Sequence, residues 1–175
     1  MHSIDKGYIH IYTGDGKGKT TAALGLALRA AGAGLSVYIA QFLKKGDYSE
    51  IKALARFSDL ITLEQFGLGR FVKGKPRAED IAAAARGLQH IKAVMAAGKH
   101  QLIVLDEANV GVSCGLLTAS ELLGIMDLKP QGTELVITGR GATPEILERA
   151  DLVSEIKSLK HYFQNGVPAR IGIEK

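Results

Sequence analysis

The sequence contains a single cysteine, no tryptophan, and aromatic residues at only 6% of its 175 positions. The lone Cys114 excludes an internal disulfide and any metal site built from several cysteines. No apolar run approaches the about 20 residues that a membrane-spanning helix requires, so we expect no membrane partner. The first six residues lack the hydrophobic core of a signal peptide, which predicts a cytoplasmic protein.

An excess of either charge is also lacking, since 22 lysines and arginines stand against 18 aspartates and glutamates, a formal net charge of +4. Such a mild excess suits small anionic ligands as well as nucleic acid. The sequence has no basic stretch with interspersed aromatic residues on which a single strand could stack, so we expect no nucleic-acid partner. The length and the 46% hydrophobic content predict one globular domain over residues 1–175.

Residues 8–23 are the stretch around which the sequence is organised. Alternating β-formers in residues 8–13 indicate a buried strand, and a helix-forming run, residues 22–29, follows a short loop. The loop has a glycine at every second position, namely Gly14, Gly16 and Gly18. Glycine lets a backbone adopt positive φ angles and approach an anion, and the N-terminus of the next helix attracts negative charge. The stretch therefore predicts a phosphate-binding P-loop.

Two side chains of this loop have predicted roles, and two positions depart from the general pattern. We expect Lys19 to reach phosphate oxygens and the Thr20 hydroxyl to ligate Mg²⁺. Thr13 stands where the general motif has glycine, and Asp15 would repel a phosphate unless its carboxylate points away. An ordinary glycine turn that opens a helix is the alternative, and a second motif downstream argues against it.

Residues 102–107 form this second motif, in which four apolar residues precede Asp106 and Glu107. The pattern is typical of a Walker B strand, whose end presents carboxylates next to the P-loop. Because Mg²⁺ prefers oxygen ligands, either Asp106 or Glu107 would hold it, directly or through water. A strand that simply ends in two charges is the alternative, which the P-loop about ninety residues earlier disfavours.

Two further segments are candidates for ligand contacts. Arg140 lies between two glycines in residues 138–141, where a strand is expected to end, and arginine is suited to phosphate. A tight turn with a solvated arginine is the alternative interpretation. His161, which is followed by Tyr162 and Phe163, could be a base, a ligand, part of a stacking patch or a structural residue.

Short apolar runs alternate with helical patterns along the chain, which predicts an α/β fold with a doubly wound, mainly parallel sheet of the P-loop NTPase (RecA-like) type. We expect strands at residues 8–13, 35–42, 60–66, 101–107, 133–138, 152–156 and, in the tail, 171–173. We expect helices at residues 19–32, 49–57, 78–97, 118–128 and from residue 144 onward. The third of these helices is predicted to bury a face formed by Ile81, Ala85, Leu88, Ile91 and Met95.

Several motifs resemble, in the same order, those of the P-loop type of ATP:corrinoid adenosyltransferase, and they cover nearly the whole chain. They are residues 13–23, 41–44, 105–109, 138–141, 160–163 and 172–173. The resemblance implies transfer of the 5′-deoxyadenosyl group of ATP to the cobalt of a reduced corrinoid, with release of triphosphate. It also implies a homodimer, Mg²⁺ or Mn²⁺ as the metal, and a flavoprotein that reduces the corrinoid.

The resemblance further implies roles for individual residues. The nucleotide-binding residues would be Gly14, Asp15, Gly16, Lys17, Gly18, Lys19, Thr20, Thr21, Arg29 and Arg140. The catalytic residues would be Lys19, Thr20 and Glu107, and the metal would be held by Thr20 with Asp106 or Glu107. Phe71 would contact the corrinoid, in a loop where some members also carry a tryptophan that this chain lacks. Because Co(I) is itself a nucleophile, no side chain would need to activate one.

Two other functions stay open on the sequence. A generic P-loop ATPase or small-molecule kinase would use Glu107 to orient water or an acceptor hydroxyl, although no kinase-like substrate motif follows. A nucleotide-gated module that binds a corrinoid without chemistry is the other alternative. The product separates the three functions, because only the transferase releases triphosphate together with an adenosylated corrinoid.

Overall fold

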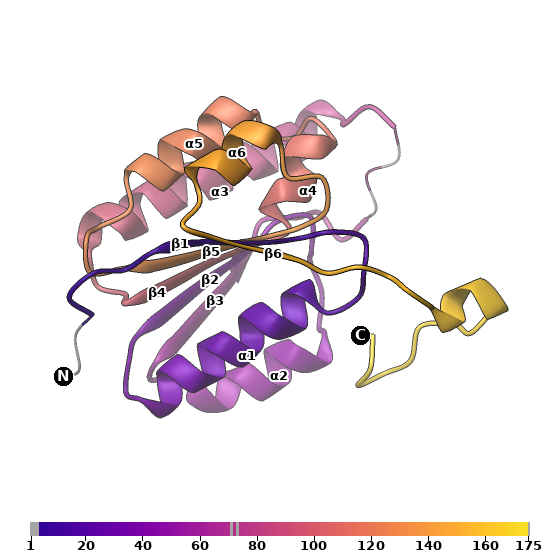
Figure 1. Ribbon diagram of the computed structural model, residues 1–175, viewed down its shortest axis with the longest axis horizontal. Helices are drawn as coiled ribbons and strands as arrows, with labels where there is room; N and C mark the ends of the chain where they lie inside the picture. The colour runs from indigo at the N-terminus through magenta and orange to yellow at the C-terminus, as the bar shows by residue number, and fades with distance from the viewer. Residues whose placement is uncertain (1–3, 71, 73, 175) are drawn as a thin grey trace.

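The computed structural model describes residues 4–70, 72 and 74–174, and within them six parallel strands form one sheet (Figure 1). Along the sheet the strand order is β3-β2-β4-β5-β1-β6. The strands are β1 (Ile9–Thr13), β2 (Val37–Gln41), β3 (Ile61–Gln65), β4 (Leu102–Asp106), β5 (Glu134–Thr138) and β6 (Leu152–Glu155). Each lies within its predicted range, so the predicted doubly wound parallel sheet is confirmed.

Helices cover both faces of the sheet (Figure 1). One face carries α1 (Lys19–Gly32) and α2 (Ser49–Leu54), which continues into the 3₁₀ turn η1 (Ala55–Phe57). The other face carries α3 (Ala78–Ala97), α4 (Ala108–Ser113), α5 (Ala119–Asp127) and α6 (Pro144–Arg149). The sequence patterns predict these helices except α4, whose six residues are too few to show a period. In the described part of the chain, no helix combines the length and apolar content needed to cross a membrane.

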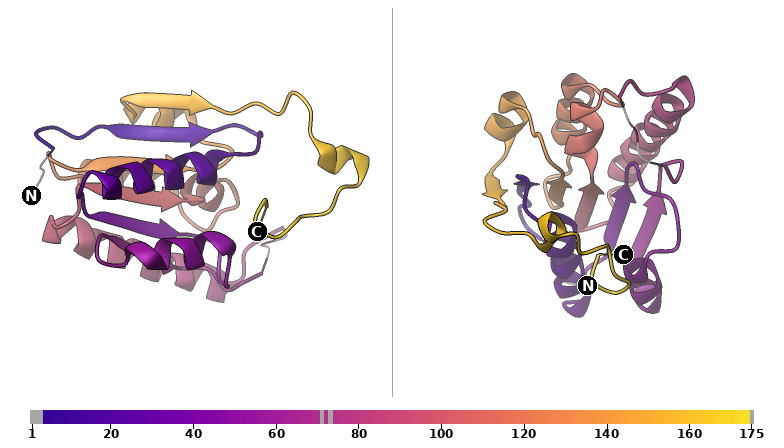
Figure 2. Two further views of the ribbon diagram at one scale, coloured as in Figure 1. Left: turned by 90° about the horizontal axis from the view of Figure 1, so that it is seen from below. Right: turned by 90° about the vertical axis from the view of Figure 1, so that its right-hand side faces the viewer.

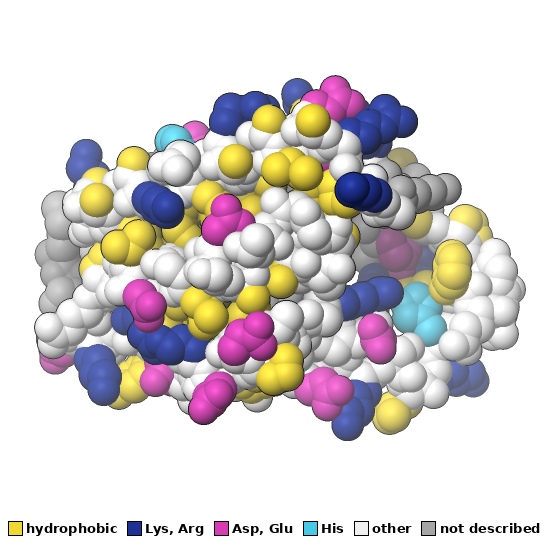
Figure 3. All heavy atoms as spheres, turned by 90° about the horizontal axis from the view of Figure 1, so that it is seen from above, with side chains coloured by type: hydrophobic (Ala, Val, Ile, Leu, Met, Phe, Trp, Pro, Cys, Tyr) yellow, Lys and Arg dark blue, Asp and Glu magenta, His cyan; other side chains and the backbone are white. Residues whose placement is uncertain are grey.

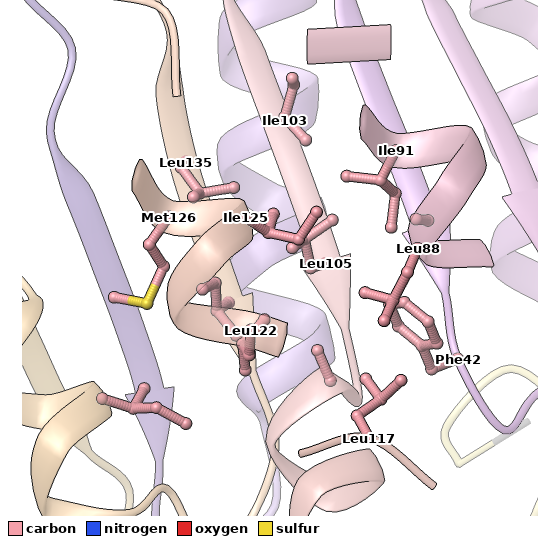
Figure 4. Close-up of a cluster of buried hydrophobic side chains, with 14 of the residues drawn as sticks. Phe42, Leu88, Ile91, Ile103, Leu105, Leu117, Leu122, Ile125, Met126 and Leu135 are labelled. Atoms are coloured by element: carbon pink, nitrogen blue, oxygen red, sulfur yellow. The ribbon is translucent and has the colours of Figure 1, made fainter. Parts of the chain in front are cut away.

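The core consists of two apolar layers, one on each face of the sheet. Along β4, Ile103 and Leu105 pack into the layer under α3 and α5, whereas Leu102 and Val104 pack into the layer under α1. Figure 4 shows the first layer, where side chains of α3 and α5 lie over those of β4 and β5. Because side chains alternate along a strand, a strand covered on both faces needs a continuous apolar sequence. This packing fixes the position of the end of β4, which carries Asp106 and is followed by Glu107.

The buried face of α3 differs from the predicted one. Leu88, Ile91 and Met95 are buried as expected, but Ile81 is 43% exposed and Ala85 is also exposed. The helix instead approaches the sheet through small residues, and its buried set is Asp80, Ala83, Ala84, Gly87, Leu88, Ile91 and Met95. A Cβ at position 87 would lie 2.8 Å from Phe66 Cγ, so the close approach requires glycine there. The prediction is wrong for Ile81 and Ala85, because the face turned toward the sheet runs through Ala83, Ala84 and Gly87 and leaves positions 81 and 85 outside it.

The tail after β6 does not return to the sheet as a strand. Residues 171–173 lie in turns, so the predicted strand is wrong. Gly172 has φ +79°, in the left-handed region, and Ile171 is 83% exposed, so this segment has neither strand backbone nor a buried face. The tail instead forms the 3₁₀ turn η2 (Tyr162–Asn165), which was not predicted, and then returns toward the carboxyl ends of the strands (Figure 2).

We expect the layer under α5 to carry much of the stability. Leu122 of α5 is 0% exposed, so Leu122→Ala should lower the free energy of unfolding by about 2–5 kcal/mol, the usual cost of truncating a buried leucine. Leu159 is 95% exposed, and Leu159→Ala should change it by less than about 0.5 kcal/mol. Urea denaturation of both variants is the measurement, and equal losses would contradict this account of the core.

Candidate functional site

The glycine loop joins β1 to α1 at the carboxyl ends of the strands and lies against the backbone just after β6. Gly14 has φ +91°, and a Cβ there would lie 2.5 Å from the carbonyl oxygen of Ile156. The Gly16 N–H donates a hydrogen bond of 2.7 Å to the same oxygen. Gly18, at φ +123°, is the N-cap residue of α1. Glycine adopts these angles at low cost, so the loop can curve around the N-terminus of α1, a favourable place for an anion.

Lys19 lies inside this loop. Its side chain is largely buried, and Nζ donates hydrogen bonds to the carbonyl oxygens of Gly14 at 2.6 Å and Gly16 at 2.7 Å. Burial lowers the pKa of Lys19 below its ordinary value, and the positive charge of Arg140 lowers it further. Two cations therefore face the same space beside the loop, an arrangement that a ligand with several negative charges would stabilise.

The carboxylate of Asp106, at the end of β4, is 0% exposed and accepts four hydrogen bonds from the described side chains. Oδ1 accepts from the hydroxyls of Thr20 and Thr138, both at 2.8 Å. Oδ2 accepts from Lys44 Nζ at 2.8 Å and Gln41 Nε2 at 3.1 Å. A buried charge is costly unless it is paired and hydrogen-bonded, and here α1, β2 and β5 all contribute donors.

Lys44 supplies the positive charge of this network, opposite the Asp106 carboxylate. Burial disfavours the charged form of the Lys44 side chain, but attraction to the Asp106 carboxylate outweighs it, and the pKa of Lys44 is raised above its ordinary value. Its Nζ also lies 3.4 Å from the Thr20 hydroxyl oxygen. The ammonium group is therefore held at the junction of the predicted P-loop threonine and the predicted Walker B aspartate.

Glu107 turns away from the sheet at the point where β4 ends. Its φ of +62° lies in the left-handed region, which is uncommon for a residue other than glycine, and its N–H donates to the Thr138 hydroxyl at 3.0 Å. Burial raises the pKa of the Glu107 carboxyl, and the charge of Asp106 raises it further, against the cations of Lys44, Lys19 and Arg140. The turn thus separates the two acidic residues, with Asp106 buried and Glu107 at the pocket described next.

A pocket of about 780 Å³ lies over the loop and the start of α1. Its lining residues are Gly16, Lys17, Gly18, Lys19, Thr20, Thr21, Leu24, Gly25, Leu28, Lys44, Ser49, Glu50, Ala53, Glu107, Arg140, His161, Gly172, Ile173 and Glu174. In the space-filling view, a hollow bordered by cationic and acidic side chains separates the tail from the body of the protein (Figure 3). The pocket is large enough for a nucleoside triphosphate, since ligand pockets commonly measure about 300–1,000 Å³.

Most of the site residues predicted from the sequence line this pocket. They are Gly16, Lys17, Gly18, Lys19, Thr20, Thr21, Glu107 and Arg140. The structure does not place Gly14, Asp15, Arg29 and Asp106 in the lining. The Asp15 side chain is exposed, as a carboxylate pointing away from a phosphate would be, and Arg29 is exposed on α1. Phe71, the residue expected to contact a corrinoid, lies outside the described residues.

Several residues of the site were not predicted as such. Gln41 and Thr138 are the last residues of β2 and β5, and Lys44 follows β2 by three positions. A polar side chain at or just after the end of a buried strand could have indicated these residues. The carboxyl ends of parallel strands meet at one edge of the sheet, where ligands bind. The tail residues Ile173 and Glu174 gave no such signal, since nothing in the local sequence indicates that the chain returns to the loop.

The tail closes one side of the pocket through Lys17 and Glu174. Lys17 Nζ donates to the Ile173 carbonyl oxygen at 2.7 Å and contacts Glu174 Oε1 at 3.1 Å. The same carboxylate accepts hydrogen bonds from the Arg170 side chain and the Tyr162 hydroxyl, and these hold the pKa of Glu174 below its usual range. The Glu174 carboxylate is therefore already paired with Lys17, one of the cationic side chains of the loop.

The same edge of the sheet offers oxygen ligands for Mg²⁺. Among the side chains that the structure describes, no group of three or more His, Cys, Asp or Glu residues is arranged to hold a metal ion. Mg²⁺ bound with nucleotides typically uses only one or two protein ligands and completes its shell with waters and phosphates. The Thr20 hydroxyl together with the carboxylate of Asp106 or Glu107 fits that requirement, and Thr20 Oγ1 already lies 2.8 Å from Asp106 Oδ1.

The fold belongs to the class of α/β proteins built on a doubly wound parallel sheet. A crystal structure of a KaiC-like protein from the archaeon Pyrococcus horikoshii is similar, with a TM-score of 0.57 over 86% of this chain and 73% of that one. The sequences are only 18% identical, so this likeness concerns the fold alone. It agrees with the predicted P-loop NTPase-like architecture.

The sequence comparisons identify the family. The family model "ATP:corrinoid adenosyltransferase BtuR/CobO/CobP" matches residues 5–174. A corrinoid adenosyltransferase of Escherichia coli strain K12 is 36% identical over 97% of this chain and 86% of its own length. The corresponding protein of Pseudomonas aeruginosa is 33% identical over 97% and 84%, and CobA of Salmonella typhimurium is 35% identical over 97% and 86%. The chain belongs to the ATP:corrinoid adenosyltransferase family, as the resemblance of its motifs predicted.

The contact between Lys17 and Glu174 leads to a testable expectation. Phosphate oxygens must compete with the Glu174 carboxylate for Lys17, so Glu174→Gln should tighten the binding of inorganic tripolyphosphate by about threefold to fivefold, the upper range for a charge pair near the surface. Glu148→Gln, which removes an exposed charge on α6, serves as the matched control. Isothermal titration calorimetry measures both. Unchanged or weaker binding in Glu174→Gln would show that Glu174 does not compete with phosphate.

Proposed function

We propose that this protein transfers the 5′-deoxyadenosyl group of ATP to the Co(I) ion of a reduced corrinoid and releases intact triphosphate. Family membership supplies the reaction, and one observation in the site carries the proposal. The pocket beside the glycine loop is lined by four cationic side chains, those of Lys17, Lys19, Lys44 and Arg140. That concentration of positive charge suits a triphosphate that remains whole and leaves as one highly charged group.

The reaction requires little acid–base chemistry from the protein. Co(I) donates an electron pair to C5′ of ATP, the cobalt–carbon bond forms, and the C5′–O bond breaks with its electrons on triphosphate. No proton has to be removed from the nucleophile. The protein's contribution would be to hold C5′ in line with the cobalt and to stabilise the charge that develops on the leaving oxygen. Lys19, the loop N–H groups and Arg140 are the residues that would stabilise this charge.

We further propose that Mg²⁺, or Mn²⁺ in its place, is bound with the nucleotide by Thr20 together with Asp106 or Glu107. When bound, the metal would neutralise part of the triphosphate charge. The donor set supports the assignment, because the Thr20 hydroxyl at the start of α1 and the buried Asp106 carboxylate at the end of β4 already contact each other. Glu107, at the pocket wall, is the acidic residue nearer to the nucleotide space.

The remaining expectations are proposals of the same kind. A flavoprotein that reduces the corrinoid, a homodimeric assembly and a cytoplasmic location would fit the family. Arg29 as a nucleotide contact and Phe71 as a corrinoid contact stay predictions, since Arg29 does not line the pocket and Phe71 is not described. Support for all of these comes from the motif resemblance rather than from the geometry of the site.

Replacing the P-loop lysine tests the nucleotide site. Lys19→Ala should weaken ATP binding by at least about tenfold, because hydrogen bonds to charged groups contribute about 1.5–3 kcal/mol. Lys45→Ala, which removes an exposed lysine outside the pocket lining, should bind ATP as the unmodified protein does. Calorimetry gives the affinities and circular dichroism checks the fold. Native spectra with equal affinities for both variants would remove Lys19 from the site.

The products of one turnover test the reaction itself. We expect phosphorus NMR of the protein with ATP, Mg²⁺ and chemically reduced cobalamin to show free triphosphate in proportion to adenosylated corrinoid. Glu107 lines the pocket and could instead orient water for attack on the terminal phosphate. Orthophosphate with ADP, and no cobalt–carbon bond in the absorbance spectrum, would therefore favour an ordinary ATPase. A corrinoid that binds without any phosphorus product would favour a binding module.

A further inference from the structure

The hydrogen-bonding capacity of the Asp106 carboxylate is already filled. A carboxylate offers about four lone-pair sites, and each is used here by one donor from Thr20, Thr138, Gln41 or Lys44. A metal ion or a metal-bound water can therefore reach Asp106 only if one donor leaves. The identity of that donor decides how the site opens.

The four donors differ in how freely they can move. Gln41 and Thr138 are 0% exposed and belong to strands β2 and β5. Gln41 is held further by Gln65 of β3, whose Nε2 donates to Gln41 Oε1 at 3.0 Å. Thr20 is fixed to the first turn of α1. Lys44 lines the pocket, as Thr20 does, but it is the one of these four donors that lies in a loop. Its long, flexible side chain is 20% exposed.

The backbone around Lys44 is built to keep its side chain at this place. Leu43 has φ +63°, in the left-handed region, and the Lys44 N–H donates to the Phe42 carbonyl oxygen at 2.7 Å. The turn packs tightly on Gly67, where a Cβ would lie 2.4 Å from the Leu43 carbonyl carbon. A branched or bulky residue is uncommon at positive φ. The strained turn aims one cationic side chain at Asp106 from the rim of the pocket.

We propose that Lys44 is a positioning residue that exchanges between two anions. Without metal and nucleotide, its ammonium group neutralises Asp106. When metal and nucleotide bind, it leaves Asp106 to the metal or its water and pairs with the phosphates. The inference rests on the proposed function in so far as Mg²⁺ and a polyphosphate share this pocket. No covalent step is involved, since only ion pairs and hydrogen bonds change partners.

Electrostatics supports the direction of this exchange. A divalent ion beside Asp106 repels an ammonium group bound to the same carboxylate, whereas a polyphosphate attracts it. The Asp106 carboxylate contacts Thr20 and Lys44. Both of these residues line the pocket together with Lys19 and Arg140, so Lys44 borders both places. A Lys44 that remains the permanent counterion of Asp106 is the competing account, and it predicts that replacing Lys44 does not weaken phosphate binding.

The first measurement is Mn²⁺ binding to the nucleotide-free protein by electron paramagnetic resonance. Lys44→Met removes the competing cation, so Mn²⁺ should bind about tenfold more tightly, within the usual range for coupled sites. Lys45→Met is the matched control, because it removes the same charge from the next position, where the side chain is exposed and outside the pocket lining. If Lys44→Met does not fold, Lys44→Gln keeps a donor for Asp106 without the charge and replaces it.

The second measurement is the binding of inorganic tripolyphosphate at saturating Mg²⁺ by calorimetry. Loss of a charged hydrogen-bond donor should weaken it by about tenfold in Lys44→Met relative to Lys45→Met. The proposal stands only if the two affinities change in opposite directions. Tighter metal binding without weaker phosphate binding, the reverse, or no change in either overturns it. Neither measurement uses a corrinoid, so failure of adenosyl transfer would refute the proposed function without deciding this inference.

Discussion

The buried negative charge of Asp106 is the constraint on which the rest of the site depends. A carboxylate at the end of the central strand would be strongly destabilising without partners. The chain supplies them from separate elements, because Thr20, Gln41 and Thr138 lie at the ends or starts of elements that meet at the same edge of the sheet. Lys44 adds the opposite charge. Satisfying one buried group therefore fixes the relative positions of the P-loop helix and three parallel strands.

A second constraint connects the glycine loop to the tail. The loop can pass close to the backbone after β6 only because Gly14 and Gly16 have no side chain to collide with Ile156. The tail leaves from that contact, and after η2 it returns to Lys17. The tail segment from Ile156 to Ile173 thus contacts the loop at both of its ends. The position of the tail and the shape of the loop are therefore determined together. This explains why a tail with mostly exposed side chains can still form a wall of the pocket.

The sequence predicted the parts of the site that depend on local pattern. Lys19 and Asp106 follow from a glycine loop before a helix and from an apolar strand with an acidic end, and both patterns occupy consecutive residues. The contact of Lys44 with Asp106 and that of Glu174 with Lys17 depend instead on which distant segments meet, which no local period records. The face of α3 was mispredicted for a similar reason, since Gly87 is buried by the proximity of Phe66 rather than by its own hydrophobicity.

The mixture of charges in the pocket follows from the proposed chemistry. If no P–O–P bond breaks, the groups that bind the triphosphate of ATP also bind the product, and a site made only of cations would hold both equally well. Such uniform binding does not lower the barrier and would retain the product. Apart from Glu107, a proposed metal ligand, the lining includes two acidic side chains, Glu50 and Glu174, beside its cationic ones. These carboxylates reduce ground-state attraction for phosphate, while the charge that develops on the leaving oxygen can still be stabilised by the cations nearest to it. Acidic residues in a phosphate pocket are then part of how triphosphate is released.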